Sequence, residues 1–280
     1  MTDGQADAHS QRGSWKSAIA GWAGRTRIGW RAIYWAHQKR DGRVMPHPFD
    51  QANGTDTTGS MPAVLIAPEI SPGELIFYYG CQPSCLRWAI GTLGAVDDAT
   101  FYDLGCGKGR ALVVASEFEF REIVGVELSG HLSSVARRNA AVVSSRFPGR
   151  PRIRVVEGDA VEAELPPGDL VVYIYHAFGE QTLTKVLANL SAAAERHDIT
   201  IIYENPVHGH VVDAAPTFSR WSGGRVPCDP DQDGDRDGGA DSVVVWRSVG
   251  SDHGRHGATP FDIVVTDPGM RAEVVDSPGH

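Results

Sequence analysis

The middle of the chain alternates between short apolar runs and longer amphipathic stretches. The apolar runs predict strands at residues 100–104, 121–127, 152–156, 169–175 and 198–204. The stretches between and after them predict helices at 110–118, 130–146, 180–195 and 207–214. Strands that alternate with helices form a parallel sheet with helices on both faces, joined by right-handed crossovers. The pattern therefore predicts an α/β fold, with its ligand site at the carboxyl ends of the strands.

The pattern changes after Ala215, where strand-like pieces follow one another without helices. The clearest of these pieces are residues 242–248 and 261–266. A further helix is expected near residues 85–93, leading into the first strand.

The length of the chain and its loop-forming stretches predict one catalytic domain with flanking segments. A chain of 280 residues with 41% hydrophobic residues can build one sizeable core. Residues 44–62 are rich in Pro, Gly, Asp and Thr and predict a linker or long loop. We place the catalytic domain at residues 63–250 and a C-terminal extension at 251–280.

The N-terminal segment, residues 1–43, is basic and rich in tryptophan. After a polar start that predicts disorder, residues 12–43 hold eight Lys/Arg, one acidic residue and four tryptophans. Such a helix could lie on an anionic membrane or bind nucleic acid. Three glycines within it weaken a long helix, and we favour a helix that caps the catalytic domain.

The net charge, the cysteine pattern and the length of the apolar runs argue against several classes of protein. A formal net charge of −9 argues against a general nucleic-acid binder. No apolar run is long enough to span a membrane and no secretory signal pattern is present, so a cytoplasmic enzyme is expected. The spacing Cys81-x-x-x-Cys85 lacks a second pair, so free thiols and no metal site are predicted. The acidic stretch 228–241 imitates a calcium loop but lacks its bidentate Glu, and predicts a solvated loop.

The segment from Phe101 to Arg110 carries the strongest chemical signal. Asp103 lies near the end of a predicted strand, and Gly105, Gly107 and Gly109 follow on alternate positions. Glycine permits a positive φ and lets a ligand approach the backbone closely. The G-x-G-x-G spacing differs from the dinucleotide pattern G-x-G-x-x-G, because Arg110 stands where the third glycine would be. A strand-to-helix turn without a ligand is the alternative interpretation.

Two more acidic residues stand at predicted strand ends. Glu127 closes the second strand, twenty residues after Gly107, where a carboxylate can accept hydrogen bonds from both ribose hydroxyls. A nicotinamide enzyme would also use such a residue. Asp159 lies in a Gly-Asp turn after the third strand. Since the carboxyl ends of parallel strands meet at one edge of a sheet, these residues predict a single site.

The ordered set of Asp103, the glycines, Glu127 and Asp159 resembles the cofactor site of class I S-adenosylmethionine-dependent methyltransferases. From about Arg31 to Val212 the chain is similar to a largely uncharacterised bacterial family of these enzymes. The marks of that family are here Trp30 to Arg43, Tyr79 with Pro83, Asp103 to Arg110, Gly125 to Glu127, Gly158 to Ala160, Phe178 to Glu180, and Asn205 with Pro206.

The resemblance implies a Rossmann-like parallel sheet that closes with a C-terminal antiparallel hairpin. It also implies S-adenosyl-L-methionine as the cofactor, with Asp159 and the backbone of Ala160 reading the adenine ring. One element departs from the family, which tends to have Asn-Pro before Phe178, whereas this chain has His176 and Ala177. That element would lie at the transfer site.

Tyr175 and His176 are the candidate catalytic residues, because they end the fourth strand. His176 could accept a proton, position a substrate, or be a loop residue without a catalytic part. Phe178 is expected to form a pocket wall, and Asn205 with Pro206 either a second rim element or a plain turn. We expect an oxygen or nitrogen acceptor on a small molecule or protein in preference to nucleic acid. The alternatives are a noncatalytic cofactor-binding protein on the same fold and, less favoured, a nicotinamide oxidoreductase.

Overall fold

The structure is a computed structural model that describes residues 47–66, 74, 77–234, 239–250, 261–267 and 270–277. All structural statements below concern these residues. The basic, tryptophan-rich segment at residues 1–43 lies outside them.

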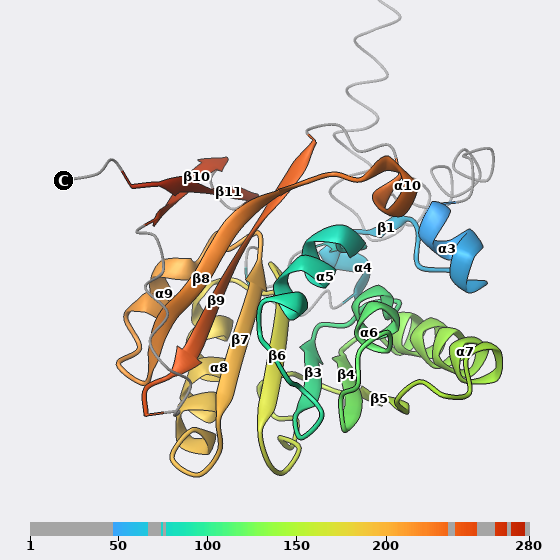
Figure 1. Cartoon of the computed structure of the whole chain (residues 1–280), viewed down its shortest axis with the longest axis horizontal. Coiled ribbons are helices and arrows are strands. Elements are labelled where there is room, and N and C mark those ends of the chain that lie inside the picture. The colour runs from blue at the N-terminus through green and yellow to red at the C-terminus, as the bar shows by residue number, and fades with distance from the viewer. Residues whose placement is uncertain are drawn as a thin grey trace, which may run out of the picture.

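A seven-stranded sheet forms the centre of the molecule (Figure 1). Its strand order is β5-β4-β3-β6-β7-β9-β8, in which the first five strands are parallel and β9 runs antiparallel to both neighbours. The parallel strands are β3 (Thr100–Leu104), β4 (Glu122–Glu127), β5 (Ile153–Glu157), β6 (Leu170–Tyr175) and β7 (Ile199–Glu204). Each begins and ends within one residue of its predicted bounds.

The closing hairpin consists of β8 (Phe218–Pro227) and β9 (Ala240–Ser248). The other predicted piece, β10 (Phe261–Asp267), instead pairs with β11 (Arg271–Asp276) in a separate two-stranded sheet. A parallel sheet with this strand order and a terminal antiparallel pair is the class I methyltransferase fold. The predicted fold class is therefore confirmed.

Helices cover both faces of the sheet (Figure 1). On one face, α5 (Pro83–Gly91), α6 (Arg110–Ala115) and α7 (Gly130–Arg146) share a core with Phe101 and Tyr173. On the other, α8 (Glu180–Ala193) and α9 (Gly209–Asp213) pack against Tyr102 and Val172. Strands buried on both faces explain the nearly continuous apolar runs of the sequence. The remaining elements are α3 (Pro48–Asn53), β1 (Ser60–Met61), α4 (Ala63–Ile66), β2 (Tyr78–Tyr79) and α10 (Pro230–Asp233).

Two predicted stretches differ in detail from what the structure contains. Within the predicted linker or loop 44–62, the described part holds α3 and a loop fixed by many hydrogen bonds. Within the predicted solvated acidic loop, Asp233 is 1% exposed and accepts hydrogen bonds from Ser84 N–H (2.9 Å) and its hydroxyl (2.6 Å). The prediction of a solvated loop is therefore wrong at Asp233, which fastens α10 to the start of α5.

Among the helices of the described residues, none is long and apolar enough to cross a membrane.

Candidate functional site

The glycine turn lies between β3 and α6, at the carboxyl edge of the sheet. Gly105 and Gly107 have φ values of +85° and +54°, which side chains other than glycine rarely adopt. The backbone N–H groups of Gly105 and Cys106 both donate to the Val126 carbonyl, each at 2.9 Å. These bonds hold the turn against the end of β4, so that it lies beside Glu127.

Glu127 is buried at the end of β4, with 5% of its surface exposed. Its Oε2 accepts the Gly107 N–H and its Oε1 accepts the Ser129 N–H, both at 2.8 Å. Burial raises the pKa of Glu127, and these two backbone bonds oppose that rise. Because each carboxylate oxygen has two lone-pair positions, Glu127 can accept further bonds from a ligand.

Two other predicted residues stand at neighbouring strand ends. Asp103 on β3 is 2% exposed, and burial, with the nearby Glu127 carboxylate, raises its pKa well above the usual range. Asp159 follows β5 and is exposed, and its Oδ1 accepts the Val161 N–H at 2.8 Å. This bond fixes the turn that presents Ala160.

A cavity of about 470 Å³ opens at this edge of the sheet. Most of the residues predicted to form the site line it, namely Asp103, Gly105, Gly107, Glu127, Asp159, Ala160 and Tyr175. Phe178 also lines it, as the sequence predicted for a wall residue. Gly109 and His176 are not among the described residues that line the cavity. Gly109 is instead the N-cap of α6, with φ +83°.

The element after β6 brings Ala177, and not His176, to the cavity. A side chain on Gly105 would come within 2.9 Å of the Ala177 Cβ, so the two residues pack closely. His176 is 5% exposed, has φ +37°, and its ring centroid lies 5.6 Å from that of His208. Tyr175 lines the cavity and its hydroxyl donates to Asp241 Oδ2 at 3.4 Å.

Asn205, predicted as a rim element or a plain turn, holds the β10–β11 hairpin. Its side-chain N–H donates to the Met270 carbonyl and its Oδ1 accepts the Ala272 N–H, both at 2.8 Å. Its φ of +52° aims the amide at β11. Within the described residues, this contact ties the C-terminal strands to the end of β7.

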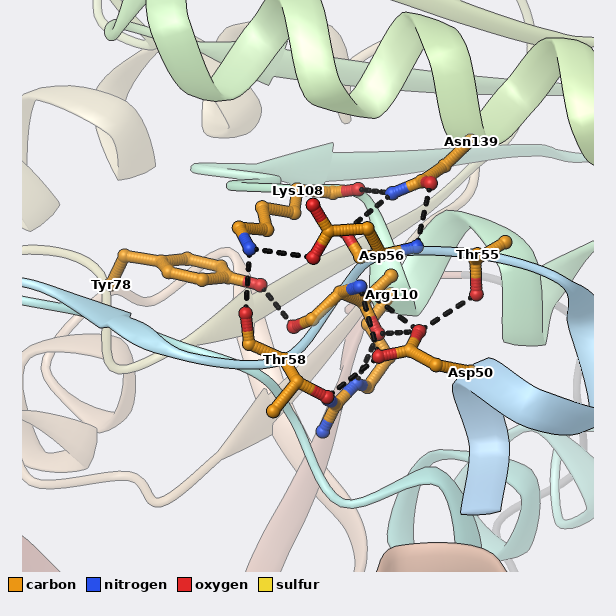
Figure 2. A network of polar contacts seen from close by, with 9 residues as sticks. Asp50, Thr55, Asp56, Thr58, Tyr78, Lys108, Arg110 and Asn139 are labelled. Atoms are coloured by element: carbon orange, nitrogen blue, oxygen red, sulfur yellow. Dashed lines mark hydrogen bonds and ion pairs between the residues drawn. The ribbon is translucent and has the colours of Figure 1, made fainter. Parts of the chain in front are cut away.

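The loop after α3 holds the glycine turn from outside, which the sequence analysis did not foresee (Figure 2). Lys108 Nζ donates to Asp56 Oδ1 at 2.8 Å and to the Thr58 carbonyl at 2.6 Å. Asn139 on α7 donates to the carbonyls of Asp56 (2.9 Å) and Lys108 (2.8 Å). Arg110 Nε donates to Thr57 Oγ1 at 2.8 Å. The Lys and Arg of the glycine motif are thus used to anchor a distant loop.

Asp50 organises that loop. Its carboxylate accepts the hydroxyls of Thr55, Thr57 and Thr58 at 2.8, 2.7 and 2.6 Å (Figure 2). Burial would raise the pKa of Asp50, but the threonine hydrogen bonds outweigh it and the pKa lies below the usual value. Tyr78 O–H donates to the Thr57 carbonyl at 2.6 Å, and its ring lies against Gly107, where a Cβ would come within 2.3 Å. Nothing local in the sequence signals these contacts.

Neither a metal nor a reactive thiol is indicated in the part of the chain that the structure describes. No group of three His, Cys, Asp or Glu residues there could hold a metal ion. Cys81, Cys85 and Cys106 are buried free thiols, and burial raises the pKa of each.

The cavity suits a nucleoside that carries an amino acid, as S-adenosylmethionine does. Its volume lies within the range of about 300–1,000 Å³ that small-molecule sites occupy. Glu127 retains acceptor positions for ribose hydroxyls, and the backbone of Gly105 and Gly107 lines the cavity without a side chain. The residues present therefore fit this cofactor.

A scan against models of protein families gives no match for this chain, and a search of curated proteins gives none either. Similar solved structures include a proposed RNA methyltransferase from Pyrococcus horikoshii, with 16% identity over 73% of this chain and 100% of that one (TM-score 0.47). A SAM-dependent methyltransferase from Leishmania major has 13% identity over 59% and 70% (TM-score 0.44). A TehB-like SAM-dependent methyltransferase from Corynebacterium glutamicum has 19% identity over 59% and 87% (TM-score 0.38). The fold class itself follows from the strand order of this chain.

Proposed function

We propose that this protein is a methyltransferase that moves the methyl group of S-adenosyl-L-methionine to an oxygen or nitrogen of an acceptor. One observation carries the proposal: the ends of β3, β4 and β5 present the glycine turn, Glu127 and Asp159 to a single cavity. Ligands of open α/β sheets bind at this edge.

Each residue has a role in this proposal. Glu127 holds the ribose hydroxyls, Asp159 and the backbone of Ala160 read the adenine, and the glycine turn admits the amino-acid part. Phe178 forms a wall of the cavity. The bound cofactor supplies a methyl group already activated by its sulfonium, so the chain mainly aligns a nucleophile and excludes water.

For catalysis we propose Tyr175 and His176. Tyr175 lines the cavity and can contact an acceptor directly. His176 precedes Ala177 and Phe178, which also line the cavity, so its backbone conformation sets where both residues lie. We favour substrate positioning over base catalysis for His176.

Calorimetry tests the cofactor. S-adenosylmethionine and its demethylated product, S-adenosylhomocysteine, should bind, whereas NAD and NADP should give no heat. Glu127→Gln should weaken binding by roughly 2 kcal/mol, because a charge-assisted bond to a hydroxyl is replaced by a neutral one.

Glu157→Gln is the matched control. Glu157 ends β5 directly opposite Glu127 in the sheet register but is exposed and does not line the cavity. It should bind like the parent. Tight NAD binding would overturn the proposal, and equal affinity of Glu127→Gln and parent would remove the ribose assignment. A screen of labelled cofactor against fractions of cell extract then seeks the acceptor, and cofactor binding with no transfer to any fraction would favour the noncatalytic alternative.

A further inference from the structure

A tyrosine and a carboxylate lie behind the cavity on the face of the sheet that α5 covers. Tyr173 on β6 pairs in parallel register with Asp103 on β3, and Glu204 on β7 pairs with Tyr175. Alternate strand residues share a face, so all four side chains belong to the same face of the sheet. The Tyr173 hydroxyl donates to Glu204 Oε2 at 2.7 Å.

The two residues differ in their access to the cavity. Tyr173 lines it, together with Asp103, Tyr175 and Cys81, although only 1% of its surface is exposed. Glu204 does not line the cavity and is 0% exposed. Glu204 Oε1 also accepts the Gln82 N–H at 2.9 Å, just before α5 begins. The phenol of Tyr173 therefore lies between the cavity and the buried carboxylate of Glu204. In this arrangement a proton could pass from the cavity through Tyr173 to Glu204.

We propose that Tyr173 and Glu204 together accept the proton of the methyl acceptor. This inference rests on the proposed function and names the residues that complete its chemistry. A buried ionisable group costs stability, and such groups gather at functional sites. Burial, with the nearby Cys81 and Glu204, raises the pKa of Tyr173 well above its usual range, so the phenol keeps its proton and passes it on only as another arrives.

The step balances in charge and atoms. The acceptor's lone pair forms the new bond to the methyl carbon, and the electrons of the broken carbon–sulfur bond stay on sulfur. The acceptor's O–H or N–H proton moves to the Tyr173 oxygen while the Tyr173 proton moves to Glu204. One positive sulfonium and one negative carboxylate become a neutral thioether and a neutral carboxylic acid.

Sinefungin tests the inference without a known acceptor. It resembles S-adenosylhomocysteine but carries an amine on carbon where the methyl-bearing sulfur would be, and this amine can donate to Tyr173. Calorimetry should show wild-type protein binding sinefungin about tenfold more tightly than S-adenosylhomocysteine, as a charge-assisted hydrogen bond predicts. Tyr173→Phe and Glu204→Gln should reduce that preference to near unity, with S-adenosylhomocysteine affinity changed less than about threefold.

Tyr102→Phe is the matched control, since Tyr102 lies on β3 but packs on the opposite face of the sheet. Tyr102→Phe should keep the full preference for sinefungin over S-adenosylhomocysteine. The inference is overturned if Tyr173→Phe keeps the preference, or if Tyr175→Phe alone loses it. Tyr173→Phe decides the question even if Glu204→Gln fails to fold, because it removes only one hydroxyl. Wild-type protein that binds S-adenosylhomocysteine without preferring sinefungin overturns this inference alone, and wild-type protein that binds neither removes the proposed function as well.

Discussion

Two residues at the carboxyl edge adopt a backbone conformation that glycine usually occupies. His176 (φ +37°) and Asn205 (φ +52°) follow the ends of the neighbouring strands β6 and β7. Such conformations cost of order 1 kcal/mol or more and persist where the surrounding structure imposes them. At His176 the imposed conformation directs Ala177 and Phe178 to the cavity.

The first prediction at this scale concerns His176. Asn tolerates positive φ better than Ala does, so His176→Asn should be more stable than His176→Ala by about 1 kcal/mol. Both variants lose the packing of the His176 ring beside His208 and should be less stable than the parent. Urea denaturation gives the free energies of unfolding.

Cofactor affinity supplies the second measurement on His176. The ring does not line the cavity, so His176→Asn should bind S-adenosylhomocysteine within about threefold of the parent. A loss of tenfold or more in that variant would show that the imidazole contacts the ligand and would favour a direct catalytic part.

The helices and strands that could be predicted are those whose residues show a clear local pattern of apolar and polar positions. The strands β3, β4, β6 and β7 are buried on both faces, whereas every residue of the edge strand β5 is half-buried or exposed. The apolar runs mark the bounds of all five strands to within one residue. β8 is less visible, because Gly223 and Gly224 interrupt it and most of its residues are only half-buried. The short helices α3 and α10 carry no apolar period and depend on contacts with distant segments.

The residues of the candidate site also fall into two groups, those that local sequence predicts and those that only the fold brings together. The glycines and Glu127 were predictable because each lies at a strand end that local sequence defines. The partnership of Tyr173 with Glu204 joins residues 31 positions apart and requires the order of β6 and β7 to be known. The contacts of Lys108 and Arg110 with residues 56–58 span 50 positions or more and have no local signal.

The docking of the β10–β11 hairpin gives a prediction at the scale of elements. Asn205→Gly preserves the positive φ but removes both side-chain bonds, one to the Met270 carbonyl just before β11 and one from the Ala272 N–H within it. Amide hydrogen exchange at Ala272 should therefore become at least about tenfold faster, while exchange in β3 and β4 stays unchanged. Asn205→Asp, which keeps the Oδ1 acceptor for Ala272, should show a smaller change. Unaltered exchange at Ala272 in Asn205→Gly would mean that other contacts hold the hairpin.

At the scale of the whole molecule, three of the buried carboxylates lie at the carboxyl edge of the sheet. Asp103, Glu127 and Glu204 are each no more than 5% exposed. Asp103 and Glu127 line the cavity, and Glu204 accepts a hydrogen bond from Tyr173, which lines it. Concentrating negative charge out of water lowers stability, which is the usual consequence of building a site for a ligand. In the function we propose, the cofactor carries a positive sulfonium, which ionised carboxylates at this edge would favour electrostatically.

The pH dependence of stability tests this arrangement through Asp103. Its folded-state pKa is raised, chiefly by burial, so the ionised carboxylate disfavours the fold at pH values above that pKa. As the pH falls below the folded pKa, the folded parent takes up a proton and the penalty declines, until it is gone below the lower pKa of the unfolded chain. Asp103→Asn should therefore be more stable than the parent at pH 8, by on the order of 1 kcal/mol or more, and the difference should shrink steadily as the pH is lowered. Asp97→Asn, at an exposed position before β3, should match the parent throughout. Thermal unfolding from pH 5 to pH 8 measures the stability of the parent and of both variants. An Asp103→Asn protein less stable than the parent at pH 8 would show that this carboxylate stabilises the fold.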